Sequence, residues 1–210
     1  DAPVLVAGST RRNEENVIAG VYEQLRADFS SLLLILVPRH IQRAPDVLRM
    51  LRQRGLAACL KSELDRSGAS RDCPVVVVDT MGELDDIYSM ATVVFCGGSL
   101  VPLGGQNVLE PAAWGVPVFF GPHMDDFADA GQLLLDSGGG VQVQDDRELT
   151  EAMRRVLADP DKGRAMGRSG QAAVLAGEPA ARRHVRLIES LIKENGEGHD
   201  ADMAAPVKED

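Results

Sequence analysis

Residues 95–122, FCGGSLVPLGGQNVLEPAAWGVPVFFGP, carry the clearest structural pattern in the chain. An apolar run that ends at Phe95 leads into a glycine-rich loop, and a second apolar run follows at residues 118–120. Between them, Asn107 can cap a short helix that carries Glu110. A strand, a glycine-rich loop, a helix and a second strand form the unit from which parallel sheets are built. The stretch therefore predicts a parallel sheet, with a loop at the edge where such sheets bind ligands.

The glycine-rich loop has two interpretations. The backbone N–H groups at the start of the following helix, together with its partial positive charge, favour a phosphate. The glycines match neither the dinucleotide-binding nor the P-loop fingerprint, so a tight crossover with Glu110 exposed to solvent is the alternative. The loop by itself leaves both open.

Apolar runs of strand length alternate with amphipathic helices along the rest of the chain. The predicted strands cover residues 4–7, 32–37, 56–60, 75–78, 92–95, 118–120 and 141–143. The predicted helices cover residues 13–27, 47–55, 84–91, 127–135, 146–157, 162–176 and 180–193, with Asn13 and Asp146 as caps and residues 67–72 as a polar loop. This alternation predicts an α/β fold with a doubly wound, mostly parallel sheet and helices on both faces. Residues 195–210 lack apolar periodicity, so we expect one domain over residues 1–194 and a disordered acidic tail over residues 195–210.

Composition narrows the class of protein. The 210 residues are 44% hydrophobic and 26% charged, which is typical of a soluble globular chain, and the net charge of −10 disfavours nucleic acid as a partner. The longest apolar run, residues 32–37, is too short to span a bilayer, and the first residues do not resemble a signal peptide. Three scattered cysteines, Cys59, Cys73 and Cys96, favour a reducing compartment and argue against a disulfide framework and a zinc site. An intracellular, soluble body without a metal is expected.

Four of the predicted strands end in polar or glycine-bearing turns. These turns are residues 8–10 (GST), residues 38–40 (PRH), residues 80–83 (TMGE) and the loop that ends at Asn107. Because the carboxyl ends of parallel strands meet at one edge of a sheet, we expect the four turns to lie close together around a ligand crevice.

Each polar candidate in these turns has a functional and a structural interpretation. Arg39 can contact an anionic or planar group, or it can form a structural ion pair. Met81 can lie over a flat base while Gly82 gives access to the backbone, or both can be turn and packing residues. Glu110 can accept hydrogen bonds from a ribose diol. Ser9 and Thr10 can contact a ligand or simply begin a loop. His40 is expected to support the residues that contact the ligand or to be solvated. Cys96 and Trp114 are expected to lie in the core.

Five segments in order closely resemble the 3-deoxy-D-manno-octulosonic acid (Kdo) transferases. They are residues 8–10 (GST), 37–40 (VPRH), 79–84 (DTMGEL), 97–102 (GGSLVP) and 105–113 (GQNVLEPAA). The likeness runs from about residue 3 to about residue 180. Members of this family are GT-B glycosyltransferases with two Rossmann-like halves, and the chain resembles the C-terminal, donor-binding half. It departs from the family at Gly8, where alanine is usual, and at Gln106, where histidine is frequent.

The resemblance implies a function and a set of site residues. The family transfers Kdo from CMP-Kdo to a lipid A precursor, with inversion, in lipopolysaccharide biosynthesis at the cytoplasmic face of the bacterial inner membrane. By resemblance, CMP would be held by Pro38, Arg39, Met81, Gly82, Asn107 and Glu110, and the phosphate or sugar would lie near Ser9, Thr10, Glu83 and Ser99. No cofactor beyond the substrate nucleotide is implied.

The resemblance also implies that the two halves of the enzyme have different functions. The family's N-terminal half supplies acceptor binding, membrane attachment and the general base, so the 210-residue chain alone is expected to bind CMP without catalysing transfer. Three alternatives remain. One is the corresponding half of a GT-B enzyme that uses a UDP-sugar, such as an epimerase or an N-acetylglucosamine transferase. Another is a non-catalytic binding domain that keeps the fold without the site. The third, and the least favoured, is a stand-alone phosphate-binding regulator.

Overall fold

The computed structural model describes residues 2–68 and 72–177. The chain divides into two units, Asp1–Val174 and Leu175–Asp210, and the sheet and the site belong to the first. The predicted helix at residues 180–193 and the predicted acidic tail at residues 195–210 lie outside the described residues, so the boundary at residue 194 stays a prediction.

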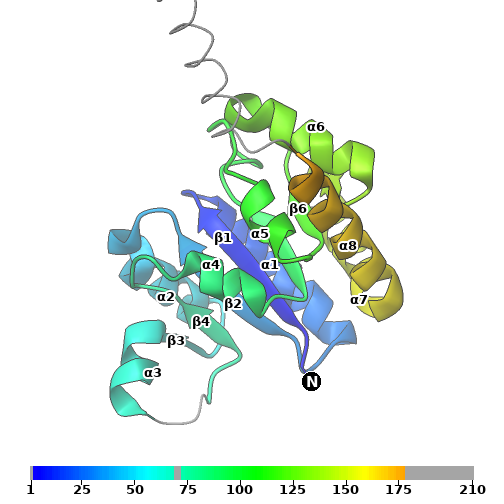
Figure 1. Ribbon diagram of the computed structural model, residues 1–210. Helices are drawn as coiled ribbons and strands as arrows, with labels where there is room; N and C mark the ends of the chain where they lie inside the picture. Colours follow the sequence, from blue (N-terminus) through cyan, green and yellow to red (C-terminus); the bar gives the residue numbers. More distant parts are fainter. Residues whose placement is uncertain (1, 69–71, 178–210) are drawn as a thin grey trace, which may run out of the picture. The chain divides into compact units, whose positions relative to one another are not determined.

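Seven parallel strands form the sheet of the first unit, in the order β3-β4-β2-β1-β5-β6-β7 (Figure 1). The strands are β1 (Val4–Thr10), β2 (Leu33–Pro38), β3 (Ala58–Leu60), β4 (Val75–Val77), β5 (Val93–Cys96), β6 (Val118–Phe120) and β7 (Gly140–Gln142). Short runs of valine, leucine and phenylalanine build the central strands because both faces of a parallel sheet are covered. Within the described residues every strand pairing is parallel, so the predicted α/β fold is confirmed.

Helices cover both faces of the sheet. They are α1 (Glu14–Asp28), α2 (Ala44–Gln53), α3 (Lys61–Ser67), α4 (Leu84–Ser89), α5 (Leu109–Ala113), α6 (Ala128–Ser137), α7 (Asp146–Ala158) and α8 (Pro160–Ala176), with 3-10 turns at Ile41–Arg43 and Asp125–Phe127. One core cluster lies between the sheet and helices α1, α2 and α7, and the other lies under α4, α5 and α6. Phe119 and Phe120 are adjacent in β6 and belong to different clusters, as the alternation of side chains along a strand requires.

Several local predictions were wrong. The sequence assigned no element to residues 61–66, where the chain forms α3, and Ser67 ends this helix instead of beginning the expected polar loop. Asn13 adopts a left-handed conformation, φ 80°, and its side chain does not cap α1. Asp145, rather than Asp146, caps α7 by accepting a hydrogen bond from the N–H of Glu148. Trp114 is 45% exposed rather than in the core, and its indole N–H donates to Asp85.

The prediction that argued against a disulfide was also wrong. Cys59 and Cys73 are joined by a disulfide, with their Cα atoms 6.3 Å apart. Cys59 lies in β3 and Cys73 shortly precedes β4, and these strands pair side by side at one end of the sheet. Strand pairing therefore brings together two cysteines whose spacing in the sequence gave no sign of it. Cys96 is buried, as expected.

The strand order reverses between β1 and β5. From β1 the chain builds β2, β3 and β4 on one side, and β5, β6 and β7 follow on the other. Such a reversal leaves a crevice outside the carboxyl ends of the two central strands, which is where open α/β sheets bind ligands. Within residues 2–68 and 72–177, none of the helices combines the length and the apolar character needed to cross a bilayer.

Candidate functional site

The four predicted turns follow β4, β2, β1 and β5, which are consecutive strands in the sheet. Their carboxyl ends therefore lie along one edge, next to the reversal of strand order. This confirms the spatial expectation drawn from the sequence, that bends far apart along the chain meet at a single edge.

A small cleft opens where the turns after β1, β2 and β4 meet. Its volume is about 100 Å³, and its lining includes Ser9, Pro38, Arg39, Met81, Gly82 and Glu83. The structure thus brings six of the ten predicted site residues together. The N–H of Arg39 donates to the carbonyl of Thr10 (3.0 Å), which ties the end of β2 to the end of β1.

Arg39 and Met81 are placed for contact with a ligand. Among the residues that the structure describes, none forms an ion pair with Arg39, so the structural alternative for this side chain is not realised. Met81 is 77% exposed and does not serve the core. Gly82 has φ +86°, with open space where a Cβ would stand, so its backbone is accessible.

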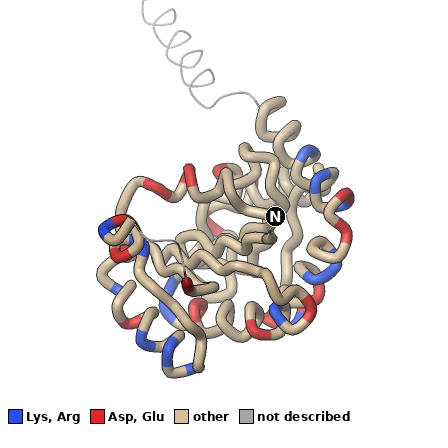
Figure 2. The backbone as a smooth tube through the Cα atoms, turned by 90° about the horizontal axis from the view of Figure 1, so that it is seen from below, with Lys and Arg blue, Asp and Glu red and all other residues tan. Residues whose placement is uncertain are grey.

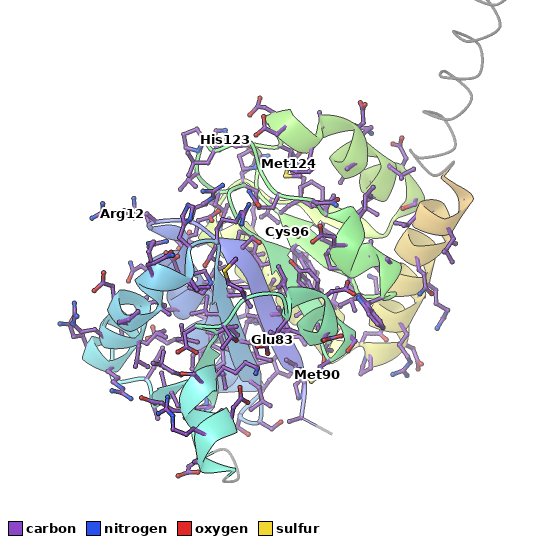
Figure 3. All side chains as sticks on the ribbon, turned by 60° about the vertical axis from the view of Figure 1, so that its left-hand side comes forward. Arg12, Glu83, Met90, Cys96, His123 and Met124 are labelled. Carbon is purple, nitrogen blue, oxygen red and sulfur yellow. A yellow bond between two sulfur atoms is a disulfide. The ribbon has the colours of Figure 1, made fainter. Side chains whose placement is uncertain are left out.

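Contacts from α3 hold both ends of the turn that carries Met81 and Gly82. The N–H and the hydroxyl of Ser62 donate to the carboxylate of Asp79 at 3.0 and 2.6 Å. Lys61 pairs with Glu83 at 2.5 Å (Figure 3 labels Glu83). Partial burial acts to raise the pKa of Asp79, but the hydrogen bonds from Ser62, together with the backbone N–H of Asp79 itself and the charge of Lys61, lower it overall. The hydrogen bond from Lys61 lowers the pKa of Glu83.

Asn107 and Glu110 lie at the same edge but do not line the cleft. The side-chain oxygen of Asn107 accepts from the N–H of Leu109 (3.1 Å), so this residue supports the start of α5 from one position further out, and Val108 rather than Asn107 is the N-cap residue. Its amide group donates to Glu110 at 3.2 Å, and Glu110 is exposed. A ligand that contacts both the cleft and this pair has to extend across the ends of β1 and β5.

Thr10 and Ser99 are fully buried, and their hydroxyl groups are used within the protein. Thr10 donates to the carboxylate of Glu15 (3.2 Å). Ser99 donates to the carbonyl of Cys96 (2.5 Å) and accepts from the N–H of Gly121 (2.8 Å). These side chains shape the loops at the sheet edge instead of lining the cleft.

Glu14 is the residue at this edge that the sequence prediction missed. Its side chain is completely buried and accepts hydrogen bonds from the N–H groups of Arg11, Gly98, Ser99 and Leu100. Burial raises the pKa of Glu14, although the four backbone groups act in the opposite direction. A pair of glutamates in the first turn of the helix after β1 was the available signal, but such residues are common at helix starts.

Charges around the rest of this edge are of both signs. Arg43 pairs with the buried Glu15 at 2.6 and 3.1 Å, and a guanidinium nitrogen of Arg11 donates to Nε2 of His40 (3.1 Å). Acidic and basic residues are interspersed along the described part of the chain (Figure 2). That part carries no continuous basic stripe of the kind that follows a nucleic-acid backbone.

Known proteins resemble the chain in both sequence and fold. A 3-deoxy-D-manno-octulosonic acid transferase of Bordetella pertussis is 33% identical over 196 residues, which cover 90% of this chain and 45% of that protein. The enzyme of the same name from Aquifex aeolicus is 32% identical over 154 residues, covering 73% of this chain and 42% of that protein. No protein-family model matches the chain.

A solved structure shares the fold of this chain over most of the length of both proteins. The C-terminal CMP-Kdo binding domain of WaaA from Acinetobacter baumannii superimposes with a TM-score of 0.75 at 29% identity, covering 83% of this chain and 90% of that domain. The chain is thus a Rossmann-like domain of the kind that forms the C-terminal half of GT-B glycosyltransferases. It is a homologue of the 3-deoxy-D-manno-octulosonic acid transferases, as its motifs suggested, and it spans less than half the length of the two relatives described.

Proposed function

We propose that this chain is the donor-binding domain of a Kdo transferase and that it binds CMP-Kdo at the carboxyl edge of its sheet. The observation that supports this most is the cleft shared by the turns after β1, β2 and β4, with Arg39 left without an ion pair among the described residues. The homology to Kdo transferases supplies the identity of the donor.

The ligand lies partly outside the cleft. A cavity of about 100 Å³ is well below the roughly 300 Å³ at which ligand pockets usually begin. In this proposal Met81 and Gly82 contact the base, and Asn107 and Glu110 contact the ribose. Pro38 shapes the wall beside Arg39, and the phosphate and sugar lie near Ser9 and Glu83. Thr10 and Ser99 contribute through the loops that they hold.

In this proposal Arg39 takes part in the reaction by stabilising charge on the leaving phosphate. When the bond from Kdo to the CMP phosphate breaks, negative charge grows on the leaving phosphate. The guanidinium of Arg39, carried by a strand end whose backbone N–H is bound to Thr10, stabilises that charge more than it stabilises the intact donor, which accelerates the reaction. No metal or further cofactor is part of this proposal.

The remaining partners are assigned to the rest of the protein. The acceptor is a lipid A precursor at the cytoplasmic face of the bacterial inner membrane, and it approaches from the half of the enzyme that this chain does not span. An inverting transfer needs a base on the side opposite the departing nucleotide. We place that base outside the chain.

Calorimetric titration of the chain with CMP and with UDP tests the proposal. CMP is expected to bind more tightly, and Arg39→Ala and Glu110→Ala are each expected to weaken CMP binding by about 10- to 100-fold, since each removes a charged hydrogen-bonding group. Arg49→Ala is the matched control, because Arg49 is an exposed arginine of α2 paired with Asp46.

Two results would contradict the assignment. A preference for UDP would favour a domain of a UDP-sugar enzyme. CMP binding that neither Arg39→Ala nor Glu110→Ala changes would favour a binding domain without this site.

A further inference from the structure

The buried carboxylate of Glu14 has no part in the proposed contacts with the donor, yet it lies between both loops of the site. Its Oε1 accepts from the N–H groups of Ser99 (3.1 Å) and Leu100 (3.0 Å). Its Oε2 accepts from those of Gly98 (2.6 Å) and Arg11 (2.8 Å). Both oxygens therefore face two donors each, and the ionised carboxylate is the form that fits four donors.

Three consecutive N–H groups that point at one acceptor form an anion-binding nest. This nest lies beside the reversal of strand order, where α/β folds commonly bind the phosphate of a nucleotide. Here the anion is the protein's own side chain. With all of these donors engaged, a ligand phosphate finds none of them available and has to lie elsewhere along the edge.

Glu14 also connects the two halves of the proposed site. On one side, Glu14 binds Arg11, which directly follows Thr10 at the end of β1. The carbonyl of Thr10 in turn accepts a hydrogen bond from the N–H of Arg39. On the other side, the carbonyl of Gly98 accepts from the N–H of Gly105 (2.9 Å), two residues before Asn107. The segment at residues 98–100 is held from its far side as well, where the carbonyl of Ser99 accepts from the N–H of His123 (3.0 Å; labelled in Figure 3).

We propose that Glu14 is a positioning residue of the donor site, an internal anion that fills the phosphate position at the strand reversal and fixes the loops that lie on either side of the nucleotide. The inference rests on the proposed function, because it assigns Glu14 a role in nucleotide affinity. Glu14 touches no part of the ligand and acts through residues 98–100 and through Arg11.

Removal of the side chain leaves four donors around an empty space. Glu14→Ala therefore creates a pocket for a small carboxylate such as formate or acetate. Glu14→Gln nearly preserves the volume, but it directs an NH2 group at two N–H donors whichever way the amide is turned. A carboxylate that is supplied from solution can therefore restore CMP affinity in Glu14→Ala but not in Glu14→Gln.

The experiment is a calorimetric titration of CMP into the wild type, Glu14→Ala and Glu14→Gln, at a temperature where circular dichroism finds each one folded. CMP affinity is expected to fall at least 10-fold in both variants. Added formate is expected to recover a large part of the loss in Glu14→Ala alone, whereas acetamide, or chloride at the same ionic strength, recovers none. Glu23→Ala is the control, since Glu23 lies on the same helix in an exposed pair with Arg54 and is expected to leave CMP affinity unchanged.

The outcomes separate this inference from the proposed function. If Glu14→Ala binds CMP within twofold of the wild type, or if formate and acetamide act alike, the inference is overturned while the proposed function stands. If the wild type binds no CMP, both are overturned. Should Glu14→Ala fail to fold, Glu14→Asp replaces it: withdrawing the carboxylate by one methylene is expected to weaken CMP binding, and an unchanged affinity overturns the inference.

Discussion

Gly97 shows how closely the two central loops approach one another. A Cβ at this position would lie 2.5 Å from the carbonyl oxygen of Ser9 and 2.6 Å from the Cα of Thr10. Both are backbone atoms, so a side-chain rotation cannot relieve the overlap. Gly97→Ala is therefore expected to lower the free energy of unfolding by about 1–3 kcal/mol, as overpacking of a tight site does, and to weaken CMP binding. Denaturant unfolding and calorimetry measure the two effects.

Gly55→Ala is the control for that substitution. Gly55 has φ +81° and open space around its missing Cβ, so alanine there strains the backbone alone, at roughly 1 kcal/mol. It lies after α2, and CMP affinity is expected to stay at the wild-type value. If Gly97→Ala also left CMP affinity unchanged, close packing at Gly97 would have no bearing on the site.

Sequence reasoning located the residues whose role follows from their position after a strand. Arg39 and Met81 could be predicted because a polar or flexible residue directly after a buried run lies at the carboxyl edge. The role of Glu14 could not, since three of its four partners lie 84 to 86 residues further along the chain. The burial of Ser99 likewise depends on the approach of Gly121, which no local pattern encodes.

Among the elements, the central strands were predictable and α3 was not. A strand covered on both faces has to be a continuous apolar run, and such runs are visible in a single sequence. The segment KSELDRS has no apolar stripe, and α3 has no buried residue among those that the structure describes. Its position depends on polar contacts with the turn after β4, and these contacts exist only once β3 and β4 have paired.

The contact between α3 and Asp79 makes a pH-dependent contribution to stability. Burial acts to raise the pKa of Asp79, but the hydrogen bonds from Ser62, with smaller contributions from the backbone of Asp79 and the charge of Lys61, lower it overall. A carboxyl group with a lowered pKa in the folded state stabilises the fold above the unfolded pKa of about 4, and this contribution is lost as the pH falls through the folded value. Ser62→Ala is expected to cost about 1 kcal/mol near pH 7 and progressively less below about pH 4.

Ser89→Ala is the comparison for Ser62→Ala. The hydroxyl of Ser89 donates to the backbone carbonyl of Asp86, which does not titrate. Urea unfolding of both variants between pH 7 and pH 3 measures the difference. A cost of Ser62→Ala that stays constant down to pH 3 would mean that its hydroxyl does not stabilise the charged form of Asp79.

At the scale of the whole molecule, the proposed ligand site lies along one edge of the sheet. The turns that carry the candidate residues all lie at the carboxyl ends of β4, β2, β1 and β5, and the chain spans 42–45% of the length of the two Kdo transferases compared with it. A site of this kind can hold a nucleotide from one side. Inversion at the sugar requires the acceptor hydroxyl and its base on the other side.

The 210-residue chain is therefore expected to bind CMP and to transfer no Kdo. The chain is incubated with CMP-Kdo and a lipid A precursor, and mass spectrometry of the lipid measures any product, while a parallel titration with CMP verifies that the donor site is intact. A full-length relative such as the Bordetella pertussis enzyme serves as the active control. Positioning of two reactants contributes up to about 7–11 kcal/mol to an enzymatic rate, and a domain that binds only the donor lacks that contribution. Kdo transfer by this chain alone would place the acceptor and the base within it, and the division of labour between the two halves would have to be abandoned.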